Sequence, residues 1–147
     1  MAKAKKPEYP FVPKTNAHLL PGQYFSFRLS NGRYACGRVL DNRYPESEGA
    51  RTTFRVGLMD WCGESPATSE SLSDRAVLEQ GWAYVGIVPR YGSMIDGWRP
   101  LELDGVVPDH AQQSHYGLEV LRILAERRVG SEQQTAVKRV GRLGAGE

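Results

Sequence analysis

The fold is decided by LPGQYFSFRLSNGRYACGRVLD (residues 20–41), in which two runs of alternating residues flank Asn31-Gly32. An Asn-Gly pair tolerates positive φ at both central positions of a type I′ turn, so it predicts a hairpin with a two-residue loop. The register that follows pairs Phe25 with Arg38, Phe27 with Cys36, and Leu29 with Tyr34. One face then carries Phe25, Phe27, Leu29, Tyr34 and Cys36, and the other carries Tyr24, Ser26, Arg28, Ala35, Gly37 and Val39. The first face is the expected core side.

Three further strands are expected outside the hairpin. Residues 52–59 alternate in polarity, residues 82–88 (WAYVGIV) are apolar on both faces, and residues 98–103 contain a proline that favours an edge position. A short helix over 74–80 is expected between them, with Ser71 or Ser73 as its cap and Gly81 as its end.

The clearest helix signal is in residues 116–128, where Glu119, Arg122 and Glu126 form one narrow polar stripe on an otherwise apolar circumference. So wide an apolar face predicts burial against the sheet and against the tail or another chain. The predicted fold class is therefore α+β, with a bent antiparallel sheet or small β-barrel of about five strands and one long C-terminal helix. The expected domain organisation is an irregular basic arm over 1–19, a single domain over 20–130 and a flexible tail over 131–147.

Composition and charge narrow the class of protein. The chain has 147 residues, two cysteines outside any CxxC pattern and a net charge of +2. Residues 15–126 carry ten arginines against fourteen acids, a net charge of −4, because the remaining basic residues lie in the two ends. The acidic body favours a basic partner over nucleic acid. The absence of a long apolar run and of a signal-peptide core predicts a cytoplasmic protein with free thiols and no membrane partner.

Patterns that could carry catalysis or bind a metal are weak. Cys62 lies in no recognisable nucleophile signature, and His110 and His115 are five residues apart, which does not place two ligands on one helical face. The carboxylate pairs Glu46/Glu48 and Glu102/Asp104 are typical of solvated charges. We therefore expect no enzyme activity, no metal and no cofactor.

Aromatic residues next to acids and glycines are more informative, in particular Asp60-Trp61-Cys62-Gly63-Glu64 and Asp96-Gly97-Trp98. Tryptophan is a favoured anchor at protein interfaces, and surrounding charges set the choice of partner. Trp61 and Trp98 lie beside expected turns, so each is a candidate for either a core or an interface residue.

The hairpin resembles the opening of the immunity protein 26 family of bacterial polymorphic toxin systems. The resemblance rests on Leu20-Pro21-Gly22-Gln23-Tyr24-Phe25 and on Gly32-Arg33-Tyr34-Ala35-Cys36-Gly37-Arg38-Val39-Leu40, with Trp61-Cys62-Gly63 as a counterpart of the family's Trp-x-Gly element. It implies a non-enzymatic α+β protein that binds and neutralises a cognate toxin by stoichiometric association. A basic nuclease is one candidate toxin, because carboxylates can occupy phosphate subsites. The expected partner-binding residues are Asp41, Glu46, Glu48, Asp60, Trp61, Glu64 and Trp98.

An alternative is a small β-barrel module that binds nucleic acid. Arg28, Arg33, Arg38 and Arg55 favour it, together with the lysine-rich N-terminal arm and aromatic residues available for stacking. The expected register places Arg28 and Arg38 on opposite faces of the hairpin, so no single basic stripe is predicted.

Overall fold

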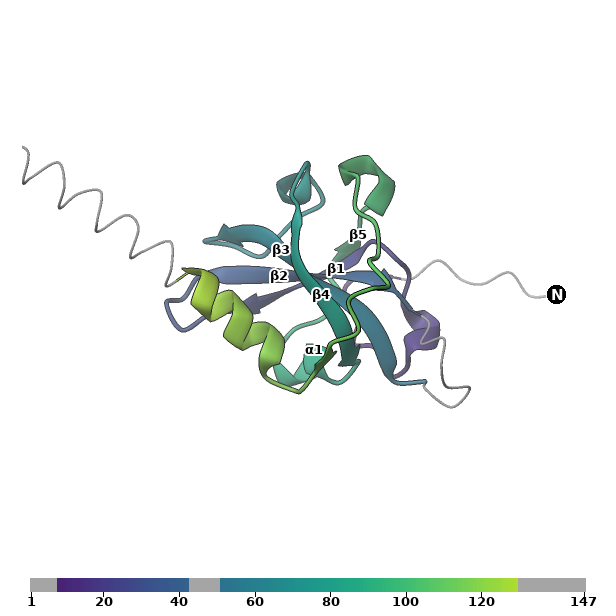
Figure 1. Cartoon of the computed structure of the whole chain (residues 1–147). Helices are drawn as coiled ribbons and strands as arrows, with labels where there is room; N and C mark the ends of the chain where they lie inside the picture. Colours follow the sequence, from purple (N-terminus) through teal and green to yellow (C-terminus); the bar gives the residue numbers. More distant parts are fainter. Residues whose placement is uncertain (1–7, 43–50, 130–147) are drawn as a thin grey trace, which may run out of the picture.

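A computed structural model describes residues 8–42 and 51–129. Its centre is one open, mixed sheet of six strands in the order β5-β1-β2-β3-β4-β6 (Figure 1). The strands are β1 (Gln23–Arg28), β2 (Tyr34–Asp41), β3 (Thr53–Gly63), β4 (Val77–Tyr84), β5 (Gly97–Trp98) and β6 (His115–Tyr116). All neighbouring strands are antiparallel except β4 and β6, which are parallel. The predicted α+β class is confirmed, whereas a closed barrel is wrong because β5 and β6 are separate edges.

The hairpin forms with a longer turn than expected. The Leu29 N–H donates to the Arg33 carbonyl at 2.7 Å, and the Gly32 N–H donates to the Leu29 carbonyl at 3.0 Å. Gly32 has φ +84°, while Asn31 is not among the residues with positive φ, so a type I′ turn does not form. The geometry is that of a type I turn followed by a left-handed glycine. Asn31 Oδ1 accepts from the Arg33 N–H at 2.9 Å, which stabilises this turn.

The longer turn moves β2 by one residue, and the predicted register is wrong. Phe27 pairs with Ala35, and Ser26 pairs with Cys36. A slip of one residue exchanges the two faces of a strand. Phe25, Phe27 and Leu29 therefore share the main core with Ala35 and Val39, while Cys36 packs with Tyr24, Met59, Ala67 and Leu72 on the opposite face.

β3 and β4 also differ from expectation. β3 continues through Asp60 to Gly63, beyond the predicted end at residue 59. The predicted helix over 74–80 is wrong, because most of it belongs to β4, which pairs with β3 from Thr53↔Tyr84 to Met59↔Val77. Only a 3-10 turn, η2 (Glu70–Leu72), precedes β4. Long-range pairing outweighs the weak local helix signal here.

The chain after β4 is largely short turns. The predicted strand over 82–88 ends at Tyr84, and Ile87–Arg90 forms the short helix α1. Trp98 lies in an edge strand, as predicted, but Leu101–Asp104 forms a 3-10 turn, η3.

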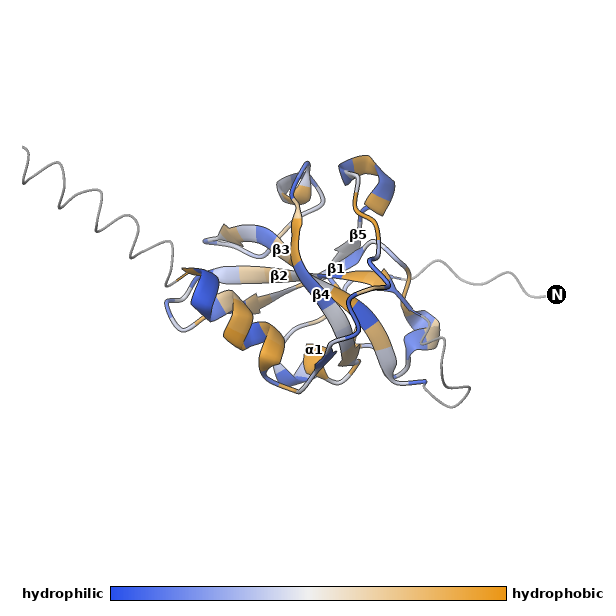
Figure 2. Cartoon of the chain, in the orientation of Figure 1, coloured by the Kyte–Doolittle hydropathy of each residue, from blue (hydrophilic) through white to orange (hydrophobic). Residues whose placement is uncertain are grey.

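The C-terminal helix is shorter than expected, so the prediction of a long helix is wrong. It spans 120–129 within the described residues, and Tyr116 belongs to β6 instead. Leu121, Ala125 and Val129 are buried at a helical spacing and pack on the main core. Hydrophobic and hydrophilic residues follow one another along this helix (Figure 2). Ile123 stays exposed, so only part of the apolar circumference is covered.

Residues before β1 lie against the sheet. The 3-10 turn η1 (Asn16–His18) precedes the buried Leu19, and Phe11 forms an isolated antiparallel bridge with Ile95. Residues 131–147 of the predicted tail lie outside the described part of the chain. In the described ranges, no helix combines the length and apolar character needed to cross a bilayer.

A buried ion pair between Arg38 and Asp104 lies on the face of the sheet opposite the 120–129 helix. The Arg38 and Asp104 side chains are both fully buried, and Arg38 Nη1 lies 2.9 Å from Asp104 Oδ2. Asp104 also accepts from Arg99 Nε at 2.8 Å and from the Asp74 N–H at 2.9 Å. This network joins η3 to the sheet and to the loop after η2. Its hydrogen bonds, those from Arg99 above all, hold the pKa of Asp104 far below its ordinary value.

Candidate partner-binding site

The structure brings together three of the predicted partner-binding residues. Asp60 and Trp61 lie near the end of β3, and Glu64 follows the strand directly. Asp41 of β2 is opposite Arg55 in the β2–β3 register, near the other end of β3. This position is on the order of 20 Å along the strand from Asp60 and Glu64. Glu46 and Glu48 lie outside the described residues. The expected acidic surface is therefore divided between two ends of the sheet.

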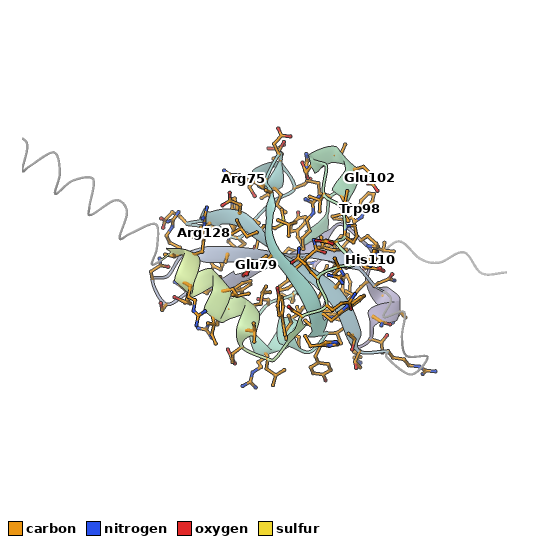
Figure 3. The ribbon with its side chains drawn as sticks, viewed as in Figure 1. Arg75, Glu79, Trp98, Glu102, His110 and Arg128 are labelled. Atoms are coloured by element: carbon orange, nitrogen blue, oxygen red, sulfur yellow. The ribbon has the colours of Figure 1, made fainter. Side chains whose placement is uncertain are left out.

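Trp98 lies at neither of these two ends of the sheet. It lies on the edge strand β5, where its ring is half exposed and Nε1 donates to the Pro21 carbonyl at 2.9 Å. In Figure 3, Trp98 lies to the right of both Arg75 and Arg128, beside Glu102. Trp98 is therefore not part of the site around Trp61.

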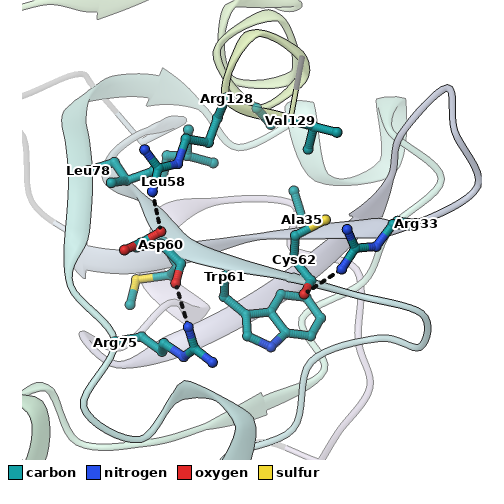
Figure 4. Close-up of a pocket in the computed structure, with 12 residues that line it drawn as sticks. Arg33, Ala35, Leu58, Asp60, Trp61, Cys62, Arg75, Leu78, Arg128 and Val129 are labelled. Atoms are coloured by element: carbon teal, nitrogen blue, oxygen red, sulfur yellow. Dashed lines mark hydrogen bonds and ion pairs between the residues drawn. The ribbon is translucent and has the colours of Figure 1, made fainter. Parts of the chain in front are cut away.

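A cavity of about 150 Å³ lies where β3 ends beside the 120–129 helix (Figure 4). We call this cavity and the residues around it the strand-end site. Its lining residues come from the hairpin, β3, the start of β4 and the helix: Arg33, Ala35, Leu58, Met59, Asp60, Trp61, Cys62, Arg75, Leu78, Ala125, Arg128 and Val129. These elements are distant in sequence, so only the folded sheet forms the cavity.

The Trp61 ring is positioned by a glycine on its own strand. A Cβ on Gly63 would lie 2.6 Å from Trp61 Cζ2, which is closer than any real carbon contact. Residues two apart on a strand project from the same face, so the absence of a side chain at Gly63 lets the indole lie against the backbone. Trp61 also packs on the cluster formed by Met59, Ala67 and Leu72. The ring is thus held on the face of β3 that points away from the helix (Figure 4).

Arginines neutralise the acids at the strand-end site. Arg128 Nη2 lies 3.0 Å from Asp60 Oδ1, and Arg33 Nε lies 3.4 Å from Glu64 Oε1. Arg75 Nη1 donates to the Asp60 carbonyl at 3.4 Å, and Arg33 Nη2 donates to the Cys62 carbonyl at 3.3 Å. The described side chains here carry three positive and two negative charges, so the site is not the acidic surface expected from the sequence.

The arginines are the residues that sequence reasoning misses. The sequence favours Arg33 only as part of a nucleic-acid surface, and it indicates no role for Arg75 or Arg128. Arg33 directly follows the hairpin turn, Arg128 lies one helical turn after Ala125, and Arg75 precedes β4. No spacing along the chain relates these three positions. Only the position of Arg33 could have been predicted from the sequence. The hairpin pattern places Arg33 at the start of the second hairpin strand, which pairs with the next strand along the chain, β3.

The catalytic alternatives are not assembled among the described residues. His115 is level with Arg55 across β4, while Cys62 lies seven residues further along β3. At about 3.3 Å per residue this separates the two side chains by on the order of 20 Å. His110 is exposed in the loop before β6, on the side of the molecule away from Arg128 (Figure 3).

The other polar groups have structural surroundings. Asp104 is buried between Arg38 and Arg99, whereas Glu102 is exposed, so the pair shares no pocket. Among the residues that the structure describes, no group of three or more His, Cys, Asp or Glu side chains is arranged to hold a metal ion. Of the arginines that favoured a nucleic-acid surface, Arg38 and Arg55 are fully buried, so they form no part of an exposed basic stripe.

Comparison of the chain with protein-family models, with curated proteins and with solved structures finds no match.

Proposed function

We propose that this protein is a non-enzymatic, immunity-type protein that binds a cognate bacterial toxin and neutralises it by stoichiometric association. In this proposal it acts in the cytoplasm of the producing cell, and its partner is a protein, not nucleic acid or a membrane. The single observation that carries the proposal is the strand-end site. There, a tryptophan held against Gly63 lies beside a small cavity bordered by Arg33, Arg75 and Arg128.

The residue types at this site are those of protein interfaces. Tryptophan and arginine dominate the few positions that carry most of the binding energy in alanine scans, and these positions are surrounded by polar residues that exclude water. Asp60 and Arg128 are each less than half exposed, and Glu64 is almost fully exposed, so the cavity has a polar border of this kind. The backbone of β3 is held in place because it is paired with β2 as far as Gly63 and with β4 as far as Met59.

The residues of the family resemblance support the proposal in a second way. Gly22 has φ +106°, and a Cβ there would lie 2.5 Å from the Arg99 carbonyl oxygen. At Gly37 a Cβ would meet the Phe25 ring at 2.5 Å. Gly37 is required by the position of the Phe25 ring in the hairpin, and Gly22 by the close approach of the Arg99 backbone, whereas Gly63 of the Trp-x-Gly element positions an aromatic ring at the candidate interface. The motif therefore contains glycines that stabilise the fold and a glycine that positions a residue of the candidate interface.

The test is co-expression with the product of the neighbouring reading frame. We expect that product to arrest growth alone, this protein to restore growth, and the two chains to elute as one stoichiometric complex. The paired change Trp61→Ala with Arg128→Glu should abolish rescue while thermal unfolding remains cooperative.

Arg90→Glu is the matched control, because Arg90 is an exposed arginine paired with Glu119 rather than with a residue of the strand-end site. It should keep full rescue. A neighbouring product that is harmless, or one that is neutralised equally well by the Trp61 and Arg128 variant, would contradict the proposal.

A further inference from the structure

The floor of the strand-end cavity is apolar. Its apolar lining residues are Ala35, Leu58, Leu78, Ala125 and Val129, and all five belong to or pack on the main hydrophobic core. A cavity of about 150 Å³ has the volume of one that holds benzene, and here an apolar floor is combined with a polar border. The space at the strand end therefore fits one apolar side chain of about the size of a phenyl ring.

The cavity is built on paired strands and a packed helix. Ala35 is opposite Cys62 in the β2–β3 register, and Leu58 is opposite Glu79 in the β3–β4 register. Ala125 and Val129 are buried on the same helical face. Each wall residue is thus held by backbone pairing or by core packing, so the cavity exists before a partner arrives and costs little ordering on binding.

The border of the cavity has an excess of positive charge. Arg33 and Arg128 form ion pairs with Glu64 and Asp60, and their side chains are 39% and 45% exposed, so a charged partner can approach both guanidinium groups from solvent. Arg75 is exposed, and in the described part of the chain it forms no ion pair; one Nη donates to the Asp60 carbonyl instead. Guanidinium groups recognise carboxylates through two parallel hydrogen bonds. A lysine-rich or arginine-rich segment would be repelled here.

We infer that the strand-end cavity receives an aromatic anchor side chain of the partner, and that acidic residues flank this anchor and pair with the surrounding arginines. The inference rests on the proposed function, because the occupant is a segment of the partner protein. It reverses the charge expected of the toxin at this surface: the contact residues are acidic, not those of a basic nuclease. Burial of the aromatic ring contributes apolar contact area to binding, and the ion pairs with the arginines fix the orientation of the partner segment.

The experiment uses the full chain and defined peptides. The probes are Ac-Asp-Asp-Phe-Asp-Asp-NH2, the same peptide with Asn in place of Asp, the same peptide with Lys in place of Asp, and an Ala version of the acidic peptide. Methyl NMR of the protein should show shifts at Ala35, Leu58, Leu78 and Ala125 with the acidic Phe peptide. The Asn and Ala versions should bind more weakly, and the Lys version should leave these methyl signals unchanged.

A charge-neutralising variant provides the second readout. Arg75→Gln should weaken binding of the acidic Phe peptide by roughly three- to tenfold, since an exposed charge-assisted contact contributes modestly. Arg90→Gln is the matched control, because Arg90 is exposed but lies outside the cavity lining, and it should leave the affinity unchanged. Raising the salt concentration should weaken binding to the wild type more than binding to Arg75→Gln.

Several results would overturn the inference: equal binding of the Lys peptide, no difference between Arg75→Gln and Arg90→Gln, or methyl shifts confined to other regions. A further arm uses 3-phenylpropionate, which carries the same ring and one carboxylate. If it binds as tightly as the peptide, the cavity is a small-molecule site and not a docking site. The peptide result is independent of the co-expression test, so failure of the toxin proposal and failure of the anchor inference are separate observations.

Discussion

The indole of Trp61 lies against the backbone of Gly63, and a Cβ on Gly63 would be 2.6 Å from Trp61 Cζ2. A glycine two residues along the same strand is therefore a condition for the orientation of this ring. Because Trp61 borders the cavity, the pair links local strand geometry to the candidate interface.

The first prediction concerns that pair. Gly63→Ala should displace the Trp61 ring and weaken partner binding by about tenfold, at a stability cost of about 1 kcal/mol from crowding. Chemical denaturation and partner affinity, measured on the same samples, separate the two effects. In a Trp61→Phe background the smaller ring should tolerate the Gly63→Ala change with little further loss of stability. An equal loss in both backgrounds would show that the indole does not cause the crowding.

The second prediction concerns acid stability. Hydrogen bonds from Arg99 and Arg38 lower the pKa of Asp104 below its ordinary value of 3.8. A depressed pKa stabilises the fold above the unfolded-state pKa, and this contribution is lost as the pH falls through that value toward the folded-state pKa. Asp104→Asn leaves Arg38 buried without a carboxylate and should cost about 3 kcal/mol at pH 7. Urea unfolding should show this difference shrinking below pH 4, and a difference independent of pH would contradict the assignment.

The third prediction concerns the other buried arginine. The Arg55 guanidinium carbon lies 4.5 Å from the centroid of the Trp82 ring, Nη1 donates to Gln80 Oε1 and Nη2 donates to the Gln112 carbonyl. Arg55→Met keeps the aliphatic stem but removes these donors, so it should destabilise the fold by about 2 kcal/mol. Amide exchange at Trp82, whose N–H donates to the Ser114 carbonyl, should accelerate as the segment before β6 loosens.

Arg28→Met is the control for this change. Arg28 is exposed, and its guanidinium carbon is 5.9 Å from the Tyr34 ring centroid. The same substitution there should alter stability by no more than about 0.5 kcal/mol. Equal effects at both positions would mean that burial of Arg55 has no energetic consequence.

The fourth prediction concerns Asp96, a half-buried carboxylate near the start of β5. Burial raises its pKa above the ordinary value of 3.8, while the Ser26 N–H that donates to Oδ2 at 3.0 Å acts in the opposite direction. A raised carboxyl pKa means that stability falls as the pH rises through the interval between the unfolded and folded values. Asp96→Asn keeps an acceptor for Ser26 and removes this loss. It should be as stable as the wild type at pH 3 and up to about 1 kcal/mol more stable at pH 7, measured by thermal unfolding.

Sequence periodicity locates the hairpin and β3 because each of these strands has one face in the main core. It cannot set the register, since Asn31-Gly32 is compatible with two turns that differ by one residue. In the folded protein Asn31 keeps negative φ and its side chain accepts from the Arg33 N–H. That choice puts Cys36 opposite Ser26, away from Phe27.

Residues 77–80 show why periodicity does not reveal the start of β4. Val77 packs on one hydrophobic cluster, Leu78 packs on the other, and the register of β4 shifts between Leu58 and Met59 of β3. A bulge interrupts the strict alternation by which a strand is recognised. The local sequence therefore indicates a short helix, and the first part of β4, which closes one wall of the cavity, is not predicted.

The local sequence determined the α+β class, the hairpin and the choice of Trp61 as a candidate interface residue. Each of these depends on a pattern that spans only a few residues: alternating polarity, turn residues, or a tryptophan close to a glycine. Tertiary structure alone decided the charge of the site. Asp60 and Glu64 form an acidic patch in the sequence, but folding brings Arg128 and Arg33 within ion-pair distance of them. Electrostatic interactions depend on distance in space, and strand pairing and helix packing bring together Asp60 and Arg128, which are 68 positions apart in the sequence.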